Sequence, residues 1–100
     1  MNFQNLVQQA QKMQKQVEKQ KKDFEDKTFE LEGQNGKIKG IMNGRFEIKE
    51  LNIDEDLLQD KEMLEDLLMV TINQTMAKIA KEKDDTLEKL TNGVDVSAFF

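Results

Sequence analysis

Two Asn-Gly pairs, at Asn35-Gly36 and Asn43-Gly44, constrain the middle of this chain more than any other feature. Asn-Gly favours the positive φ angles of tight hairpin turns. Strand-like runs, in which apolar and polar residues alternate, flank the pairs at residues 28–32, 37–42 and 45–53. Together the turns and the runs predict a three-stranded antiparallel meander.

The third run changes face part of the way along. Phe46 and Ile48 share one parity, whereas Leu51 and Ile53 have the opposite parity. A slip of one residue moves every following side chain to the other face of a strand. We therefore expect a bulge or a local twist near residues 49–50.

A long amphipathic helix is predicted before the strands. Residues 2–27 are rich in Gln, Lys and Glu and contain no Gly. Apolar residues recur there at alternating spacings of three and four, which is typical of a helix with one apolar seam. The seam consists of Phe3, Leu6, Ala10, Met13, Val17 and Phe24.

A second long helix is predicted after the strands. Asp60 suits its N-cap, the acids that follow complement the positive end of the helix dipole, and Asn92-Gly93 suits its end. Its apolar stripe runs through Leu64, Leu68, Ile72, Met76, Ile79, Leu87 and Leu90. The fold class is therefore α+β, with a long N-terminal helix, a three-stranded antiparallel meander and a long C-terminal helix.

The helices are too long for the sheet. A helix of ~25 residues is ~37 Å long, whereas a strand of five or six residues spans ~17–20 Å. The apolar seams nevertheless continue along the overhangs, from Phe3 to Met13 and from Ile79 to Leu90. A monomer would expose these seams, so we expect a homodimer with projecting helical arms.

Composition excludes several classes of function. The chain has no Cys and no His, which excludes disulfides and catalysis by imidazole or thiolate, and argues against a zinc site. Acids from Asp54 to Glu65 partly match EF-hand spacing, but Gln59 stands where that loop needs Gly. We expect no enzyme activity, cofactor, metal or small-molecule substrate.

No segment of the sequence indicates a membrane partner. The N-terminus lacks a basic segment followed by an apolar run, and no apolar run approaches the ~20 residues of a membrane span. We expect a cytoplasmic protein. The formal net charge of −5 argues against binding nucleic acid by bulk charge, so any contact with DNA must come from a local patch.

The first helix carries such a patch. At ~100° per residue, four lysines fall within one arc of ~80° opposite the apolar seam. Residues 2–22 contain only one acid, Glu18. The lysines are Lys12, Lys15, Lys19 and Lys22. They fit a stripe of point charges along a phosphate backbone, although a lysine stripe by itself is more often the solvated face of an ordinary amphipathic helix.

Further cations could extend this surface. The strands contribute Lys37, Lys39 and Arg45, and the last helix contributes Lys78 and Lys81. On the strands, such charges also protect sheet edges from aggregation. Arg45 is the only arginine, so a set of bidentate contacts to guanine is not available.

Several segments resemble the YbaB/EbfC family of bacterial nucleoid-associated proteins over nearly the whole chain. The most specific are Met42-Asn43-Gly44, the Ile53-Asp54 pair followed by Leu57-Leu58, residues 60–67 and Asn73. The run Gln-Ala-Gln-Lys-Met-Gln at residues 9–14 is also similar to the family. The chain departs from the family at Glu55, where members often have Pro, and at Glu50, where they often have a second basic residue.

The resemblance implies a single domain over residues 1–93 with a C-terminal tail at 94–100. It implies a homodimer whose sheets form a joint centre and whose helices project like tweezers. It also implies an association with bacterial chromosomal DNA and with gene regulation, and it carries over no catalytic residues.

The leading hypothesis is therefore a homodimeric, nucleoid-associated DNA-binding protein. Binding would be mainly electrostatic and weakly sequence-specific, and it would regulate gene expression. The alternative is a protein-interaction module that acts with a replication, recombination or repair protein. The acidic net charge and the terminal Phe99-Phe100 pair favour this alternative, although the pair could also fold back on the core.

Overall fold

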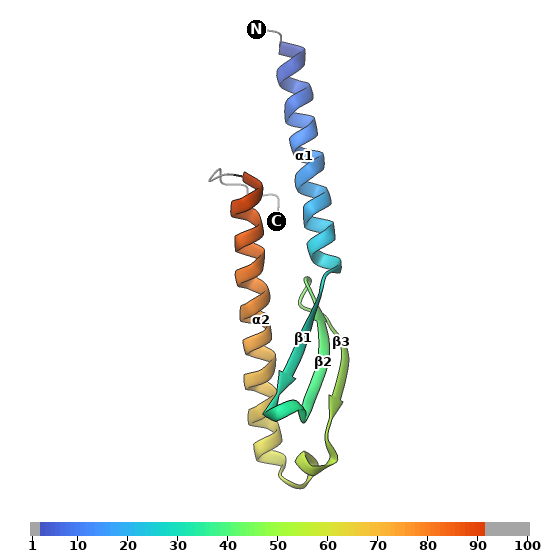
Figure 1. Cartoon of the computed structure of the whole chain (residues 1–100), viewed down its shortest axis with the longest axis vertical. Helices are drawn as coiled ribbons and strands as arrows, with labels where there is room; N and C mark the ends of the chain where they lie inside the picture. Colours follow the sequence, from blue (N-terminus) through green and yellow to red (C-terminus); the bar gives the residue numbers. More distant parts are fainter. Residues whose placement is uncertain (1–2, 92–100) are drawn as a thin grey trace.

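The computed structural model describes residues 3–91, which form two long helices and a three-stranded sheet. The elements are α1 (Phe3–Asp26), β1 (Thr28–Gly33), β2 (Ile38–Asn43), β3 (Ile48–Ile53) and α2 (Lys61–Thr91). Figure 1 shows α2 running along the sheet, while α1 projects beyond it. This order confirms the predicted α+β arrangement of helix, meander and helix. The predicted helix stop at Asn92-Gly93 and the tail at 94–100 lie outside the described residues.

The sheet is an antiparallel meander in the order β1-β2-β3. Along β2 and β3, Ile41 is paired with Glu50, whereas the next residue, Met42, is paired with Ile48. Lys49 is therefore the extra residue on β3. The bulge predicted near residues 49–50 is confirmed.

The two hairpin turns use their Asn-Gly pairs differently. In the first turn, Asn35 and Gly36 have positive φ angles of 54° and 87°. In the second turn the expectation is wrong, because Phe46 adopts the positive φ, at 64°, and Gly44 does not. The loop contains one residue more than a two-residue turn needs, and the αL conformation at its end closes such a loop.

Gly44 is required for a different reason. A Cβ atom at Gly44 would lie 2.0 Å from the carbonyl oxygen of Phe24. The Gly44 N–H also donates a 3.0 Å hydrogen bond to the carbonyl of Lys27. The turn therefore lies directly against the end of α1, and only Gly leaves room for this contact.

The core lies between one face of the sheet and α2. Leu31, Ile38 and Met42 from the sheet are almost completely buried, and Ile79 from α2 is 0 % exposed. Leu64, Leu68 and Ile72 of the α2 stripe pack against this cluster, and Leu57 is buried with it. Burying each such side chain contributes roughly 1.5–3 kcal/mol. Leu57 belongs to a short 3-10 helix, Glu55–Gln59, in the connection to α2.

The start of α2 is capped as predicted. Met63 N–H donates a 3.1 Å hydrogen bond to the Asp60 carboxylate. The preceding short helix is capped in the same way, because Asp56 N–H donates a 2.9 Å hydrogen bond to Asp54. The acidic turn thus supplies acceptors for helix N–H groups, which would otherwise have no partner.

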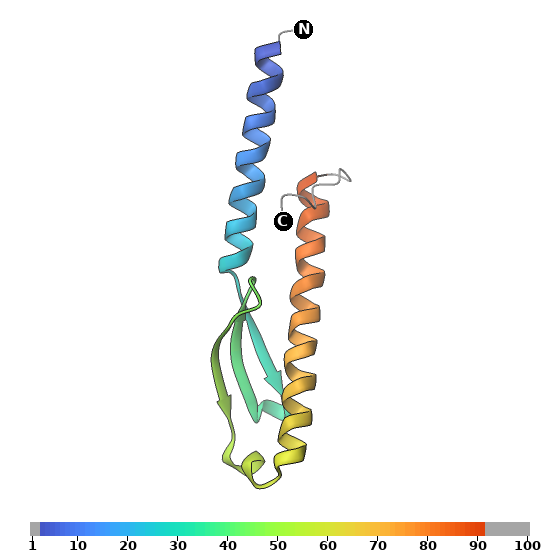
Figure 2. The ribbon, with the colours of Figure 1, turned by 180° about the vertical axis from the view of Figure 1, so that it is seen from behind.

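The first part of α1 makes few contacts within the chain. Residues 3–16, here called the arm, are all exposed, and Val17 and Phe24 are the residues of α1 that are buried. The seam residues Phe3, Leu6 and Met13 are 76 %, 43 % and 46 % exposed. Figure 2 shows the arm extending past the ends of both the sheet and α2. The predicted overhang is therefore present at the N-terminal helix. On α2 the expectation is wrong at Ile79, which is 0 % exposed because it belongs to the core cluster that includes Phe24 and Phe29.

Candidate nucleic-acid interface

The predicted lysine stripe lies on the exposed face of α1. Lys12, Lys15, Lys19 and Lys22 are all exposed, whereas Val17 and Phe24 of the same helix point into the molecule. The four ammonium groups are therefore accessible on the side opposite the seam. From Lys12 to Lys22 the helix advances about 15 Å, enough to follow several phosphates of a nucleic-acid strand.

The structure places the sheet cations among acids. Lys39 is the cross-strand partner of Glu32 and shares a shallow surface pocket with Glu30 and Glu50. The Lys37 ammonium is 3.7 Å from the carboxylate of Asp56. Lys37 and Lys39 are therefore not joined to the α1 stripe in one uniformly basic surface.

The two predicted cations of α2 are exposed, but their surroundings differ from those of the stripe. Lys78 lies on the side of α2 next to the β1 edge, where it lines a shallow pocket together with Glu30 and Glu32. Lys81 is one turn further along the helix and is also exposed. The glutamates reduce the positive potential that Lys78 adds to this surface.

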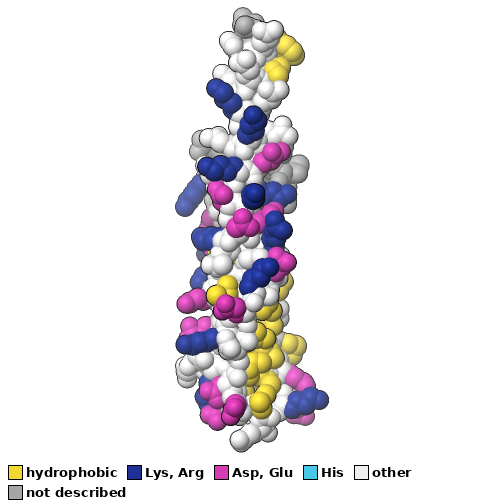
Figure 3. All heavy atoms as spheres, turned by 90° about the vertical axis from the view of Figure 1, so that its right-hand side faces the viewer, with side chains coloured by type: hydrophobic (Ala, Val, Ile, Leu, Met, Phe, Trp, Pro, Cys, Tyr) yellow, Lys and Arg dark blue, Asp and Glu magenta, His cyan; other side chains and the backbone are white. Residues whose placement is uncertain are grey.

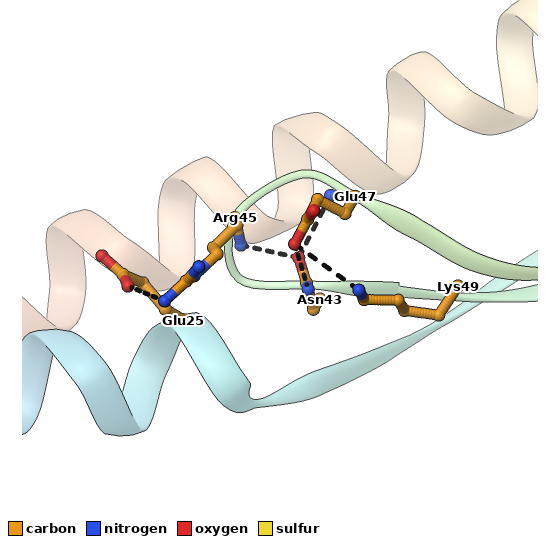
Figure 4. A network of polar contacts seen from close by, with 5 residues as sticks. All are labelled: Glu25, Asn43, Arg45, Glu47 and Lys49. Atoms are coloured by element: carbon orange, nitrogen blue, oxygen red, sulfur yellow. Dashed lines mark hydrogen bonds and ion pairs between the residues drawn. The ribbon is translucent and has the colours of Figure 1, made fainter.

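Arg45 belongs to a network of polar contacts at the β2–β3 turn (Figure 4). Its guanidinium Nη2 lies 2.9 Å from the Glu25 carboxylate of α1. The turn itself is fixed by Asn43, whose side-chain oxygen accepts hydrogen bonds from Arg45 N–H at 2.9 Å and Glu47 N–H at 3.1 Å. Arg45 therefore extends from a well-ordered turn toward the end of α1.

Glu47 completes the network on the other side of the turn. The Asn43 amide donates a 2.9 Å hydrogen bond to the Glu47 carboxylate, and Lys49 lies 3.7 Å from it. The hydrogen bond from Asn43, followed by the charges of Lys49 and Arg45, lowers the pKa of Glu47 below its usual value of 4.5. The carboxylate is therefore held in its charged form.

Two cations that sequence reasoning missed lie close to Arg45. Lys21 of α1 and Lys83 of α2 line a pocket of about 250 Å³ together with Arg45 and Glu25. A signal for both was present in the sequence. Lys21 follows the seam residue Val17 by four positions, and Lys83 follows Ile79 of the α2 stripe by four positions, so each is a cation on an apolar face.

Apolar surface is also exposed on the side of the molecule where β3 lies. Ile48 and Leu51 of β3 are 41 % and 42 % exposed, and Met69 and Met76 of α2 are 57 % and 39 % exposed. Figure 3 shows hydrophobic side chains gathered in a strip over the sheet half of this face, with charged side chains on both sides of the strip. This strip and the arm seam are contiguous groups of exposed apolar side chains, not single scattered ones, and such groups mark interaction surfaces.

The described part of the chain contains neither a metal site nor a membrane span. Between residues 3 and 91, no group of three or more His, Cys, Asp or Glu side chains is placed to hold a metal ion. Neither α1 nor α2 is long and apolar enough to cross a membrane.

Comparison with known proteins identifies relatives over almost the whole chain. The sequence model of the YbaB/EbfC DNA-binding family matches residues 1–94. A nucleoid-associated protein of Psychrobacter sp. (strain PRwf-1) is 44 % identical over 99 residues, which cover 94 % of this chain and 90 % of that protein. A nucleoid-associated protein of Clostridium novyi (strain NT) is 36 % identical over 102 residues, covering 100 % and 90 % of the two chains.

A solved structure has the same architecture. The crystal structure of an uncharacterized protein from Helicobacter pylori superimposes with a TM-score of 0.73 at 25 % sequence identity. The superposition covers 85 % of this chain and 91 % of that one. The arrangement of two long helices around a three-stranded sheet therefore also occurs in an experimental structure.

Proposed function

Because the chain belongs to the YbaB/EbfC DNA-binding family, we propose that it is a homodimeric, nucleoid-associated protein that binds duplex DNA mainly through phosphate contacts. The observation that carries this proposal is the exposed lysine stripe of α1, which lies on a helix that projects from an otherwise acidic protein. The names of the relatives from Psychrobacter and Clostridium support a place on the bacterial nucleoid in the cytoplasm.

The stripe binds DNA by displacing counterions. Each lysine that reaches a phosphate releases part of the condensed cation layer of the duplex, so affinity falls steeply with salt. Lysine offers a flexible point charge and no fixed hydrogen-bond fork, so it does not distinguish bases. Lys81 and Lys78 of α2 extend the contact. The sheet cations contribute more weakly. Acids lie beside Lys37 and Lys39, and Glu25 forms an ion pair with Arg45.

The protein binds DNA as a homodimer. A second copy supplies apolar partners for the arm seam and for the exposed side chains of Ile48, Leu51, Met69 and Met76, which would otherwise remain in water. Because the same surfaces are then buried on both copies, the interface closes with two-fold symmetry. Two lysine stripes on one particle raise the effective affinity for a single duplex.

Light scattering tests the dimer. The wild type is expected to have about twice the mass of one chain, whereas a variant with Leu6→Ser and Met13→Ser is expected to approach the mass of one chain. A variant with Gln8→Ser and Gln11→Ser, at exposed polar positions of the same helix, controls for loss of helix propensity. A wild type with the mass of one chain at all concentrations contradicts the dimer.

A titration with duplexes tests the function. Nuclease-treated protein is mixed with several unrelated labelled duplexes at low and at physiological salt, and binding is followed by fluorescence anisotropy. We expect similar affinities for all sequences and a steep loss of affinity as salt rises. Absence of binding at low salt would overturn the proposal.

Occupancy of many chromosomal sites is the route by which such a protein would regulate gene expression.

The acidic charge and the exposed arm seam favour a second candidate function, an interaction module for a replication, recombination or repair protein. The net charge of −5 repels DNA from the protein surface outside the lysine stripe. The exposed arm seam offers an apolar helix face that can bind in a groove of another protein. Capture from lysate with and without nuclease separates the two functions, because partners bridged by DNA are lost on nuclease treatment and directly bound partners are kept.

A further inference from the structure

The pocket beside Arg45 is formed where three elements meet. The end of α1 contributes Lys21 and Glu25, the β2–β3 turn contributes Arg45, and α2 contributes Lys83. The three segments are distant in the sequence and are brought together only by the fold. Three cations and one carboxylate line this pocket, whereas acids outnumber basic residues in the chain as a whole, which carries −5.

The turn that carries Arg45 is held in place before any ligand arrives. Asn43 fixes the backbone on both sides of Arg45 through its two accepted hydrogen bonds, and Gly44 packs against the Phe24 carbonyl. Phe46, which also lines the pocket, is held in the αL region at φ 64°. A bulky residue adopts this conformation only at an energetic cost, so the surrounding contacts define the turn strongly. A preformed turn reduces the entropy lost on binding a ligand.

The contact between Arg45 and Glu25 indicates which chemistry the pocket accepts. A carboxylate oxygen lies 2.9 Å from the Arg45 Nη2 atom (Figure 4), so an anionic oxygen fits at this position. A guanidinium group also matches the oxygen spacing of phosphate and can bind two oxygens at once. Lys21 and Lys83 add two point charges to the same space.

We propose that this pocket binds a phosphate group, with Arg45 as its main ligand, Lys21 and Lys83 as supporting cations, and Glu25 as a competing anion. Two sources supply this chemistry, a phosphate of a DNA backbone and free inorganic phosphate. Lys21 is adjacent in sequence to Lys22, the last member of the α1 stripe. With DNA as the source, the inference rests on the proposed function and adds one fixed phosphate contact at the inner end of the stripe.

The first arm of the test uses inorganic phosphate. Amide signals of the full-length protein are followed by NMR while phosphate replaces chloride at constant ionic strength. We expect saturable shifts at Gly44, Arg45 and Phe46. In a variant with Lys21→Gln and Lys83→Gln, the phosphate affinity derived from these shifts is expected to be about tenfold lower. Glu25→Gln is expected to tighten binding by about threefold, because it removes the competing carboxylate. Two matched controls, Lys61→Gln with Lys89→Gln and Glu55→Gln, lie outside the pocket and are expected to leave the affinity unchanged.

The second arm uses a labelled duplex with the same variants. Weaker duplex binding for the Lys21 and Lys83 variant than for the Lys61 and Lys89 control identifies the DNA backbone as the source of the phosphate. Phosphate-dependent shifts without this difference identify free phosphate and still support the site. If phosphate gives no saturable shifts and both variants bind the duplex equally, the pocket proposal is overturned while the DNA-binding function stands. If the wild type binds phosphate but no duplex, the proposed function fails and the pocket remains.

Discussion

Helix α2 and the arm of α1 carry apolar seams of similar spacing, but only α2 packs most of its seam, from Leu64 to Ile79, against the core of the same chain, with Met76 as its exposed member. Ile79 of α2 is 0 % exposed, whereas Leu6 of the arm is 43 % exposed. The difference arises from what lies opposite each seam. The sheet covers the first part of α2, whereas the arm extends past the sheet into solvent. A heptad pattern thus shows that a helix has an apolar face, and the rest of the fold decides whether the same chain covers it.

Truncation of a core side chain should have the largest effect and should separate the two regions most clearly. Ile38→Ala is expected to lower the free energy of unfolding by about 3 kcal/mol, because Ile38 is 0 % exposed and its removal leaves a cavity. Leu6→Ala is expected to cost less, and its cost should grow with protein concentration if the arm packs on a second copy as proposed. Urea denaturation at two protein concentrations measures both. Equal losses of unfolding free energy for the two variants, independent of protein concentration, would contradict the distinction between a seam covered within the chain and one covered by a second copy.

Substitution at Gly44 tests the joint between the end of α1 and the β2–β3 turn. Gly44→Ala is expected to cost about 2 kcal/mol, because the new Cβ would lie 2.0 Å from the Phe24 carbonyl oxygen and a backbone atom cannot turn away. Gln20→Ala, at an exposed position of α1, serves as control. Urea denaturation gives both values. An unchanged unfolding midpoint for Gly44→Ala would show that α1 does not pack against the turn as described.

Removal of the Asn43 side chain tests the polar part of the same joint. Asn43→Ala is expected to cost about 1–2 kcal/mol, because it leaves the N–H groups of Arg45 and Glu47 without their acceptor. It should also raise the pKa of Glu47 toward 4.5, because the Asn43 amide is the main cause of the lowered value. NMR titration of the Glu47 carboxyl group measures this shift, and an unchanged pKa would argue against the hydrogen bond.

The lowered pKa also fixes a sign for the dependence of stability on pH. Glu47 has a lower pKa in the folded than in the unfolded protein, so its contribution is present above about pH 4.5 and is lost as pH falls through the folded value. In the Asn43→Ala variant, the loss of stability on protonation of Glu47 should be smaller, because the pKa of Glu47 is then closer to its value in the unfolded protein. The effect is small, because the Glu47 carboxylate is exposed to solvent.

The ion pair between Lys27 and Glu82 should have the smallest effect. It links the residue just after α1 to the middle of α2, but the two side chains are 50 % and 39 % exposed. Glu82→Gln is therefore expected to change the free energy of unfolding by less than about 1 kcal/mol. Thermal unfolding at low and high salt measures it. A larger, salt-sensitive loss would mean that this ion pair contributes substantially to holding α1 against α2.

Local signals in the sequence predicted the elements well. The alternation in the strands, the parity change on β3 and the Asp60 cap each depend on residues close together in the chain, and the structure confirms all three. The αL conformation of Phe46 was missed, because it follows from loop length and from the packing of Gly44 on Phe24.

The candidate interface was less predictable than the fold. The stripe on α1 follows from helical periodicity alone, so its exposure could be predicted. The acids around Lys39 and the meeting of Lys21, Arg45 and Lys83 depend on contacts between distant segments. A sequence shows the sign of each charge, but only the fold shows which charges become neighbours.

The salt dependence of duplex binding tests the central claim, that the exposed face of α1 contacts DNA phosphates. The wild type is compared with a variant in which Lys12, Lys15 and Lys19 are replaced with Gln, and with a control in which Lys49, Lys61 and Lys89 are replaced instead. In a plot of log K against log salt, we expect the slope of the α1 variant to become shallower by about 0.9 for each phosphate that the variant no longer neutralises, and the control to keep the wild-type slope. Equal slopes for all three proteins would contradict the account.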